Sequence, residues 1–125
     1  MDMDDKKRYR IQHQLSQEDR IEMFGTIALL PQVDECRIHL QNNKVGSKAS
    51  ILCYPGTDPR TWSQFATAEN FSGSRAVIRI GTHKYRITFD QRQGIVISDM
   101  SEEALDEEVL EDILDCIDAY CGIER

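Results

Sequence analysis

Apolar and polar side chains alternate between residues 75 and 99, in three short runs that are separated by turn residues. Strict alternation of β-branched and aromatic residues with polar ones is typical of strands that bury one face. The pattern therefore predicts a three-stranded antiparallel meander. Its buried face is expected to carry Ala76, Ile78, Ile80, Tyr85, Ile87, Phe89, Ile95 and Ile97.

The same alternation gives an expected register for the meander. Pairing Ile80 with Tyr85, and Phe89 with Ile95, keeps every apolar side chain of the three strands on one side of the sheet. Gly94 then lies at the end of the second turn, where a positive φ is often required. A slip of one residue would turn the apolar set outward, so we expect this register to be well specified.

The opposite face of the meander is basic. In the expected register Arg79 lies directly opposite Arg86, and like charges in that position destabilise a sheet. An anion bound from outside would relieve the repulsion, and the alternative is that carboxylates of the same chain, or salt, balance the charge. The candidate anion-binding residues are Arg75, Arg79, Lys84 and Arg86. The same face also carries an apolar stripe, which suggests a homodimer and consists of Val77, Thr88 and Val96.

A different period governs the C-terminal part of the chain. Apolar residues three or four positions apart, from Leu105 to Ile117, predict an amphipathic helix that begins at the N-cap Ser101 and ends at Gly122. Its apolar stripe is expected to pack on the buried face of the meander. The opposite face is acidic, and its candidate partner-binding residues are Glu103, Asp106, Glu107, Glu111, Asp115 and Asp118.

The patterns in the earlier part of the chain are weaker. Residues 1–10 are rich in charge and are expected to form a flexible tail. For residues 17–30, an N-cap at Ser16 and a helical apolar stripe favour a helix, whereas other apolar positions also fit a strand, so both interpretations stay open. Residues 33–56 predict a hairpin, and a short helix is expected to begin near Asp58.

Together these elements predict a single α+β domain over residues 1–125, with an antiparallel meander sheet and helices packed on one face. A chain of 125 residues buries enough surface for a core without disulfides or metals. The expected core residues are Trp62, Phe65, Ile78, Ile80, Tyr85, Ile87, Phe89, Ile97, Leu105, Val109, Ile113 and Ile117.

The net charge of −7 is distributed unevenly. Residues 99–125 hold eleven acidic residues against one base, whereas residues 1–98 hold eleven acidic residues against fourteen bases. The acidity thus belongs to the expected C-terminal helix, and the remainder of the chain is mildly basic. The sequence has no apolar run long enough for a membrane span and no apolar segment typical of a secretory signal, so we expect a cytoplasmic protein with reduced thiols.

No pattern in the sequence predicts catalysis, a metal or a cofactor. Cys36 and His39 have the spacing C-x-x-H, but three positions along a strand put two side chains on opposite faces. Cys116 and Cys121 are five positions apart on a helix and do not converge as zinc ligands do. The motifs of serine hydrolases, phosphate-binding loops and dinucleotide-binding folds are missing. We therefore expect a protein that is not an enzyme.

Two binding functions remain as hypotheses. The charge distribution favours a non-catalytic protein–protein interaction module, such as an adaptor, chaperone or inhibitor, that presents the acidic helix face to a basic protein surface. The alternative is an anion-binding or nucleic-acid-binding protein that uses the basic outer face of the meander. Nucleic acid ranks lower as a partner, because the aromatic residues of the meander point to its buried face and cannot stack on bases.

Overall fold

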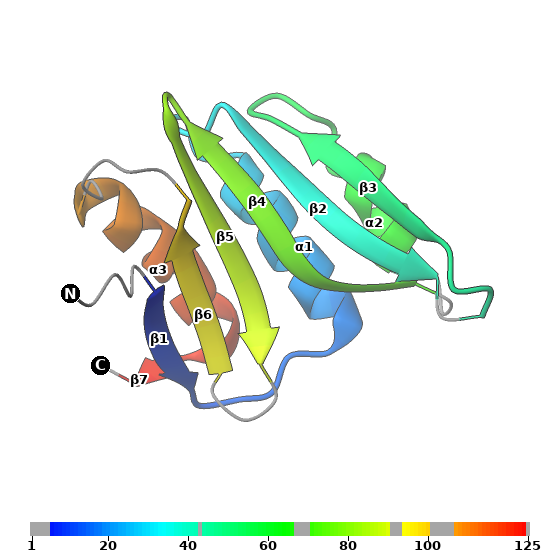
Figure 1. The fold of residues 1–125 in the computed structure, drawn as a ribbon, viewed down its shortest axis with the longest axis horizontal. Coiled ribbons are helices and arrows are strands. Elements are labelled where there is room, and N and C mark those ends of the chain that lie inside the picture. The colour runs from blue at the N-terminus through cyan, green and yellow to red at the C-terminus, as the bar shows by residue number, and fades with distance from the viewer. Residues whose placement is uncertain (1–5, 43, 67–70, 91–93, 101–106, 125) are drawn as a thin grey trace.

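The computed structural model describes residues 6–42, 44–66, 71–90, 94–100 and 107–124 of the chain (Figure 1). The elements in chain order are β1 (Lys6–Ile11), α1 (Gln17–Ala28), β2 (Glu35–Asn42), β3 (Lys48–Cys53), α2 (Arg60–Ala66), β4 (Phe71–Ile80), β5 (His83–Asp90), β6 (Gly94–Asp99), α3 (Glu107–Cys121) and β7 (Ile123–Glu124). The strands form a seven-stranded antiparallel sheet in the order β3-β2-β4-β5-β6-β1-β7. The helices pack on one face of this sheet, so the α+β prediction is confirmed.

Strands β4, β5 and β6 form the predicted meander at the centre of the sheet. The expected register between β5 and β6 is confirmed. Between β4 and β5 the expected pairing of Ile80 with Tyr85 is wrong by two residues, because Tyr85 pairs with Ile78. The cause is the turn, which is shorter than expected and begins with Gly81 at a φ of +61°. A shift of two residues keeps every side chain on its predicted face.

The shift changes which charged residues are neighbours. Arg79 lies opposite Lys84, and Arg86 lies opposite a valine of β4, so the expected direct pair of arginines is wrong. Arg79 and Lys84 form a like-charged pair in its place. The carboxylate of Asp34 supports this end of the hairpin, since it accepts a hydrogen bond from Gly81 N at 2.6 Å and lies 3.5 Å from Arg79 Nη1.

Strand β1 corrects the interpretation of the N-terminus. Lys6–Ile11 pairs with β6 and with β7, so the basic half of the expected flexible tail belongs to the sheet. Tyr9 and Ile11 alternate with basic residues and pack against the core, which explains why this segment adopts a strand. Residues 1–5 lie outside the described part of the chain.

The segment between residues 17 and 30, for which the sequence allowed a helix or a strand, contains helix α1. Ser16 is its N-cap, as predicted, and Ser16 Oγ accepts a hydrogen bond from Asp19 N at 3.1 Å. The strand interpretation is wrong because apolar residues spaced three and four apart cover one side of the segment and pack it against the sheet. The buried residues of α1 are Ile21, Met23, Phe24, Gly25, Ile27 and Ala28.

Gly25, in the middle of α1, lies against the side chain of Trp62 in α2. A β-carbon at this position would overlap the indole ring of Trp62. Trp62 is only 2% exposed, and its Nε1 donates a hydrogen bond to Glu22 Oε2 at 3.2 Å. A glycine inside a helix costs about 1 kcal/mol relative to alanine, and here the missing side chain makes room for the largest side chain of the core.

Helix α3 lies beside α1 on the inner face of the sheet (Figure 1). It is described from Glu107 onward, and the predicted N-cap Ser101 lies outside the described residues. Gly122 follows its last turn with a φ of +66°, as the sequence predicted for the end of the helix. The buried residues of α3 are Leu110, Ile113, Leu114, Ile117 and Cys121.

The core fills the space between the sheet and the helices. The predicted core residues that are buried are Trp62, Ile78, Tyr85, Ile87, Ile97, Ile113 and Ile117. Those that are partly buried are Ile80, Phe89 and Val109. The side chains of Phe65 and Leu105 lie outside the described part of the structure. Among the described helices, none combines the length and the apolar composition that crossing a membrane requires.

Candidate functional site

One side of the sheet is not covered by any described helix, because α1, α2 and α3 lie on the other side (Figure 1). We call this uncovered side the basic face. Side chains along a strand alternate between the two faces of a sheet, so the residues of the basic face are those that alternate with the buried ones. Its described basic residues are Arg8, Arg10, Arg37, His39, Lys48, Arg75, Arg79, Lys84 and Arg86.

Antiparallel pairing aligns these residues in rows that run across the strands. In one row His39 of β2 pairs with Arg75 of β4, which pairs with Thr88 of β5. In the next row Arg37 of β2 and Arg86 of β5 flank a valine of β4. Neighbouring strands are about 4.8 Å apart. The backbones of the three arginines therefore lie within roughly 10 Å of one another.

Among the described residues, the charge of the basic face is balanced at one end and not at the centre. At the end, Arg79 forms ion pairs with Asp34 at 3.5 Å and with Glu35 at 3.4 Å. At the centre, neither Arg75 nor Arg86 forms an ion pair with a carboxylate of the described residues. Arg86 Nε is buried and has no hydrogen-bond partner in the same part of the chain. A buried donor without an acceptor costs free energy, so this centre favours a ligand that supplies acceptors.

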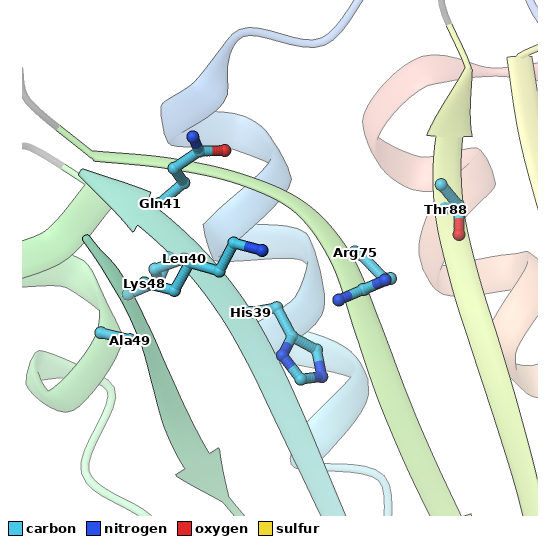
Figure 2. Close-up of a pocket in the computed structure, with 7 residues that line it drawn as sticks. All are labelled: His39, Leu40, Gln41, Lys48, Ala49, Arg75 and Thr88. Carbon is cyan, nitrogen blue, oxygen red and sulfur yellow. The ribbon is translucent and has the colours of Figure 1, made fainter. Parts of the chain in front are cut away.

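A hollow of about 270 Å³ opens on the basic face beside these arginines (Figure 2). It lies where the register of β2 with β4 shifts between His39 and Leu40. In Figure 2, Lys48 reaches from β3 over β2, so that its ammonium group lies on the same side as His39 and Arg75. No carboxylate of the described residues lines the hollow, which is formed by His39, Leu40, Gln41, Lys48, Ala49, Arg75 and Thr88.

The electrostatic environment of His39 is strongly positive. Burial lowers the pKa of His39 below its usual value of 6.5, and the nearby guanidinium groups of Arg75, Arg37 and Arg86 lower it further. Both effects act against the charged imidazolium, which loses solvation and lies next to other cations. The same potential that disfavours a proton on His39 attracts an anion to the hollow.

The structure brings together only part of the predicted anion site. Arg75 and Arg86 lie at the centre of the basic face, whereas Arg79 and Lys84 pair with each other at its end, next to two carboxylates. Sequence reasoning missed the contribution of β2 and β3, namely Arg37, His39 and Lys48. The signal for β2 was present in the alternation of residues 36–40, but only the pairing of β2 with β4 shows that this row continues the basic face.

The exposed side of α3 carries the described members of the predicted partner-binding set, which are Glu107, Glu111, Asp115 and Asp118. Asp118 also has a structural role, since its Oδ1 accepts a hydrogen bond from Ile123 N at 2.8 Å. Glu103 and Asp106 lie outside the described residues. A groove of about 370 Å³ runs between α3 and β1 and is lined by Lys7, Tyr9, Glu107, Leu110, Glu111 and Leu114.

The four cysteines are free thiols that lie in or beside the core. Burial raises the pKa of the Cys53 and Cys121 thiols to about 11, and it also raises the pKa of Cys36 and of Cys116. A thiol with a raised pKa stays protonated at neutral pH and is a poor nucleophile. Within the described ranges, no three side chains of His, Cys, Asp or Glu are grouped closely enough to hold a metal ion.

Comparison with known proteins does not assign the chain to a family. No protein-family model matches it, and neither a curated protein nor a solved structure matches it significantly. Function is therefore inferred from the chemistry of the site.

Proposed function

We propose that this protein is a non-catalytic module that binds the phosphate backbone of nucleic acid through the basic face. The observation that carries the proposal is the group of Arg37, Arg75 and Arg86 on a sheet face that no described helix covers. Among the described residues, this group has no carboxylate to balance it. Such a cluster of cations gains affinity for a polyanion because binding releases the counterions of the polyanion.

The types of side chain on the basic face favour phosphate as the anion. Guanidinium groups donate paired hydrogen bonds to phosphate oxygens, which a lysine ammonium group does not do. Ser50 and Thr88 lie in the same row as His39 and Arg75, and hydroxyl groups of this kind commonly contact nucleic-acid backbones. The described outward positions of the strands hold no Phe, Tyr or Trp. We therefore expect binding that does not depend on base sequence.

Two other polyanionic partners fit the basic face less well. Attachment to an anionic membrane usually combines basic residues with exposed apolar side chains. The centre of an interface with an acidic protein is likewise apolar. Within the described strands, Leu52, with 41% of its surface exposed, is the large exposed apolar side chain. A partner held mainly by charge, such as a nucleic-acid backbone, matches the surface better.

The salt dependence of oligonucleotide binding tests this proposal. Neutralising about five phosphates should make the logarithm of the binding constant fall with the logarithm of salt concentration, with a slope of about −4.5 on duplex DNA or about −3.5 on a single strand. Fluorescence anisotropy with a labelled oligonucleotide measures this slope. Oligonucleotides of equal length and different sequence should give equal affinities. The proposal is wrong if no binding occurs at low salt, or if affinity does not change with salt.

The apolar stripe predicted as a homodimer contact lies among the arginines. Thr88 pairs with Arg75 on one side and with Val96 on the other, and Val77 pairs with Arg86. A dimer through this stripe would bring the guanidinium groups of two copies together, which costs free energy unless anions lie between them. The homodimer therefore stays a prediction, and sedimentation with and without a polyanion tests it.

The exposed acids of α3 support a second candidate function, which is docking of a basic protein surface. The groove between α3 and β1 has apolar walls next to Glu107 and Glu111, so a basic amphipathic segment would find both charge and apolar contact there. This proposal concerns the other side of the molecule and is compatible with the first.

Charge reversal on α3 tests the second candidate. Glu107→Lys, Glu111→Lys and Asp115→Lys together should reduce the affinity for a lysine-rich amphipathic peptide by roughly tenfold or more, since several favourable charge pairs become unfavourable. Asp118 is left intact because it holds the end of the helix. Calorimetry measures the affinity, and circular dichroism checks the fold. Unchanged peptide affinity in the folded triple variant would contradict this function.

A further inference from the structure

We propose that the hollow beside His39 is a site for one phosphate group, and that it holds this group more tightly when His39 is protonated. The inference rests on the proposed function for the identification of that group as a phosphate of a nucleic-acid strand. The site itself is defined by the described residues, so it can be tested without a nucleic acid. If this site exists, a phosphate group binds preferentially at one position of the basic face and not equally well at every basic residue.

The geometry of the hollow suits a phosphate group. His39, Lys48 and Arg75 come from three different strands, and their nitrogen atoms lie on one side of the sheet around a common space (Figure 2). Gln41 and Thr88 add an amide and a hydroxyl group to the same lining. The volume of about 270 Å³ leaves room for the tetrahedral group and for water around it. Each of these five side chains has a hydrogen atom to donate to a phosphate oxygen.

The described charges that act on His39 all have the same sign. Arg37 faces it from its own strand β2, Arg75 from β4 and Arg86 from β5, and each of these guanidinium groups lowers the pKa of His39. From β3, Lys48 reaches the same hollow. The carboxylates of Asp34 and Glu35 are engaged with Arg79 at the end of the face (Asp34 at 3.5 Å, Glu35 at 3.4 Å).

Binding of an anion and protonation of His39 must therefore favour each other. Without an anion, burial and then the positive surroundings hold the pKa of His39 below 6.5. A bound anion offsets those charges and raises the pKa again. Thermodynamic linkage requires that a proton on His39 strengthens anion binding by the same factor. Affinity should consequently increase as the pH falls through the interval between the pKa of His39 in the free protein and that in the complex.

The test is a titration of the intact protein with sulfate, whose charge and shape resemble those of phosphate but do not change between about pH 5 and pH 8. The ring signals of His39 in NMR spectra report both occupancy and protonation. Sulfate should raise the pKa of His39, and its affinity at about pH 5 should be roughly tenfold higher than at about pH 8, as expected for one added charge-assisted hydrogen bond. Unchanged His39 signals at saturating sulfate, or equal affinity at both values, would overturn the proposal.

Two variants separate this site from general charge attraction. His39→Gln should remove the pH dependence of sulfate affinity, which the backbone amide signals around the hollow report in this variant. Arg75→Gln should lower sulfate affinity at both pH values by roughly tenfold. Arg79→Gln is the matched control, because it removes the same charge from a residue already paired with Asp34 and Glu35, and it should change sulfate affinity by less than twofold. An equal loss in the Arg75 and Arg79 variants would contradict a discrete site.

The source of the phosphate is resolved by two small probes. A dinucleotide with one internal phosphodiester should shift the His39 signals if the site holds a backbone phosphate. A nucleoside 5′-monophosphate that shifts them when the dinucleotide does not would assign the site to a terminal phosphate and overturn the backbone assignment. Loss of the sulfate response with retained, salt-dependent oligonucleotide binding would reject this inference alone. Retained sulfate binding without oligonucleotide binding would reject the proposed function alone.

Discussion

The double substitution Arg75→Glu/Arg86→Glu should reduce the affinity for an oligonucleotide by roughly 100-fold or more at low salt. In the proposed function each residue contributes a charge-assisted hydrogen bond to phosphate, and the loss of two such bonds corresponds to about 3 kcal/mol before the repulsion from the new carboxylates is counted. Neither arginine forms an ion pair with a carboxylate of the described residues, so no internal pair is broken. Anisotropy with the same labelled oligonucleotide measures the effect, and the salt slope should become shallower by about 2.

Arg60 provides the control for net charge. It lies on α2, on the helix side of the sheet, and its side chain is 91% exposed. Arg60→Glu changes the net charge by the same amount as Arg75→Glu or Arg86→Glu alone. The Arg60 variant should keep oligonucleotide affinity within about threefold of the wild type, whereas each single substitution on the basic face should lower it by roughly tenfold or more. Equal losses in all three single variants would mean that overall charge, and not the basic face, determines binding.

The substitution Gly25→Ala should destabilise the fold by about 3 kcal/mol. Alanine is normally better than glycine inside a helix by about 1 kcal/mol, so a simple helix argument predicts the opposite sign. The structure reverses that expectation, because the new methyl group would overlap the buried indole ring of Trp62 and the helices would have to move apart. Urea unfolding followed by circular dichroism measures the change in the free energy of unfolding.

A second background shows whether Trp62 is the cause. Trp62→Leu removes the ring that faces Gly25 and is itself destabilising, since the tryptophan is almost fully buried. In the Trp62→Leu protein, Gly25→Ala should be neutral or should stabilise by up to about 1 kcal/mol, as helix propensity predicts. The difference between the two backgrounds is the coupling of the two positions. An equal cost of Gly25→Ala in both backgrounds would place the clash elsewhere.

The sequence predicts which face of the sheet a strand residue occupies better than it predicts which residue of the next strand it pairs with. Period-two alternation depends on adjacent residues, so it assigned Ile78, Tyr85 and Ile87 to the buried side correctly even though the register of β4 with β5 was wrong. That register depends on the length of one turn, and Gly81 permits a tighter turn than the apolar pattern suggests. Apolar and basic residues also alternate within residues 6–11, but the many charged residues of this segment favoured the interpretation as a flexible tail.

The candidate site could be predicted only in part, for a related reason. Arg75 and Arg86 are close in sequence and were grouped from the meander alone. Arg37, His39 and Lys48 join them through the pairing of β2 with β4 and with β3, and the sheet order β3-β2-β4-β5 skips from one hairpin to another. The positions of charged residues and the hydrophobic period of a sequence do not show which strands become neighbours in the sheet. The role of Gly25 was hidden similarly, because its partner Trp62 is 37 residues away along the chain.

The layered arrangement gives the molecule two electrically different sides. The arginines of the basic face belong to the open side of the sheet, because they alternate with the buried residues. Helix α3, whose exposed residues include acids, lies on the other side of the sheet (Figure 1). This separation of charge gives the described part of the molecule an electric dipole, and the field of a polyanion would turn it during approach so that the sheet arrives first. Proteins bound side by side along one strand would then present their acidic helices outward. Such a complex would repel further strands, which favours a coated single strand over a condensed aggregate.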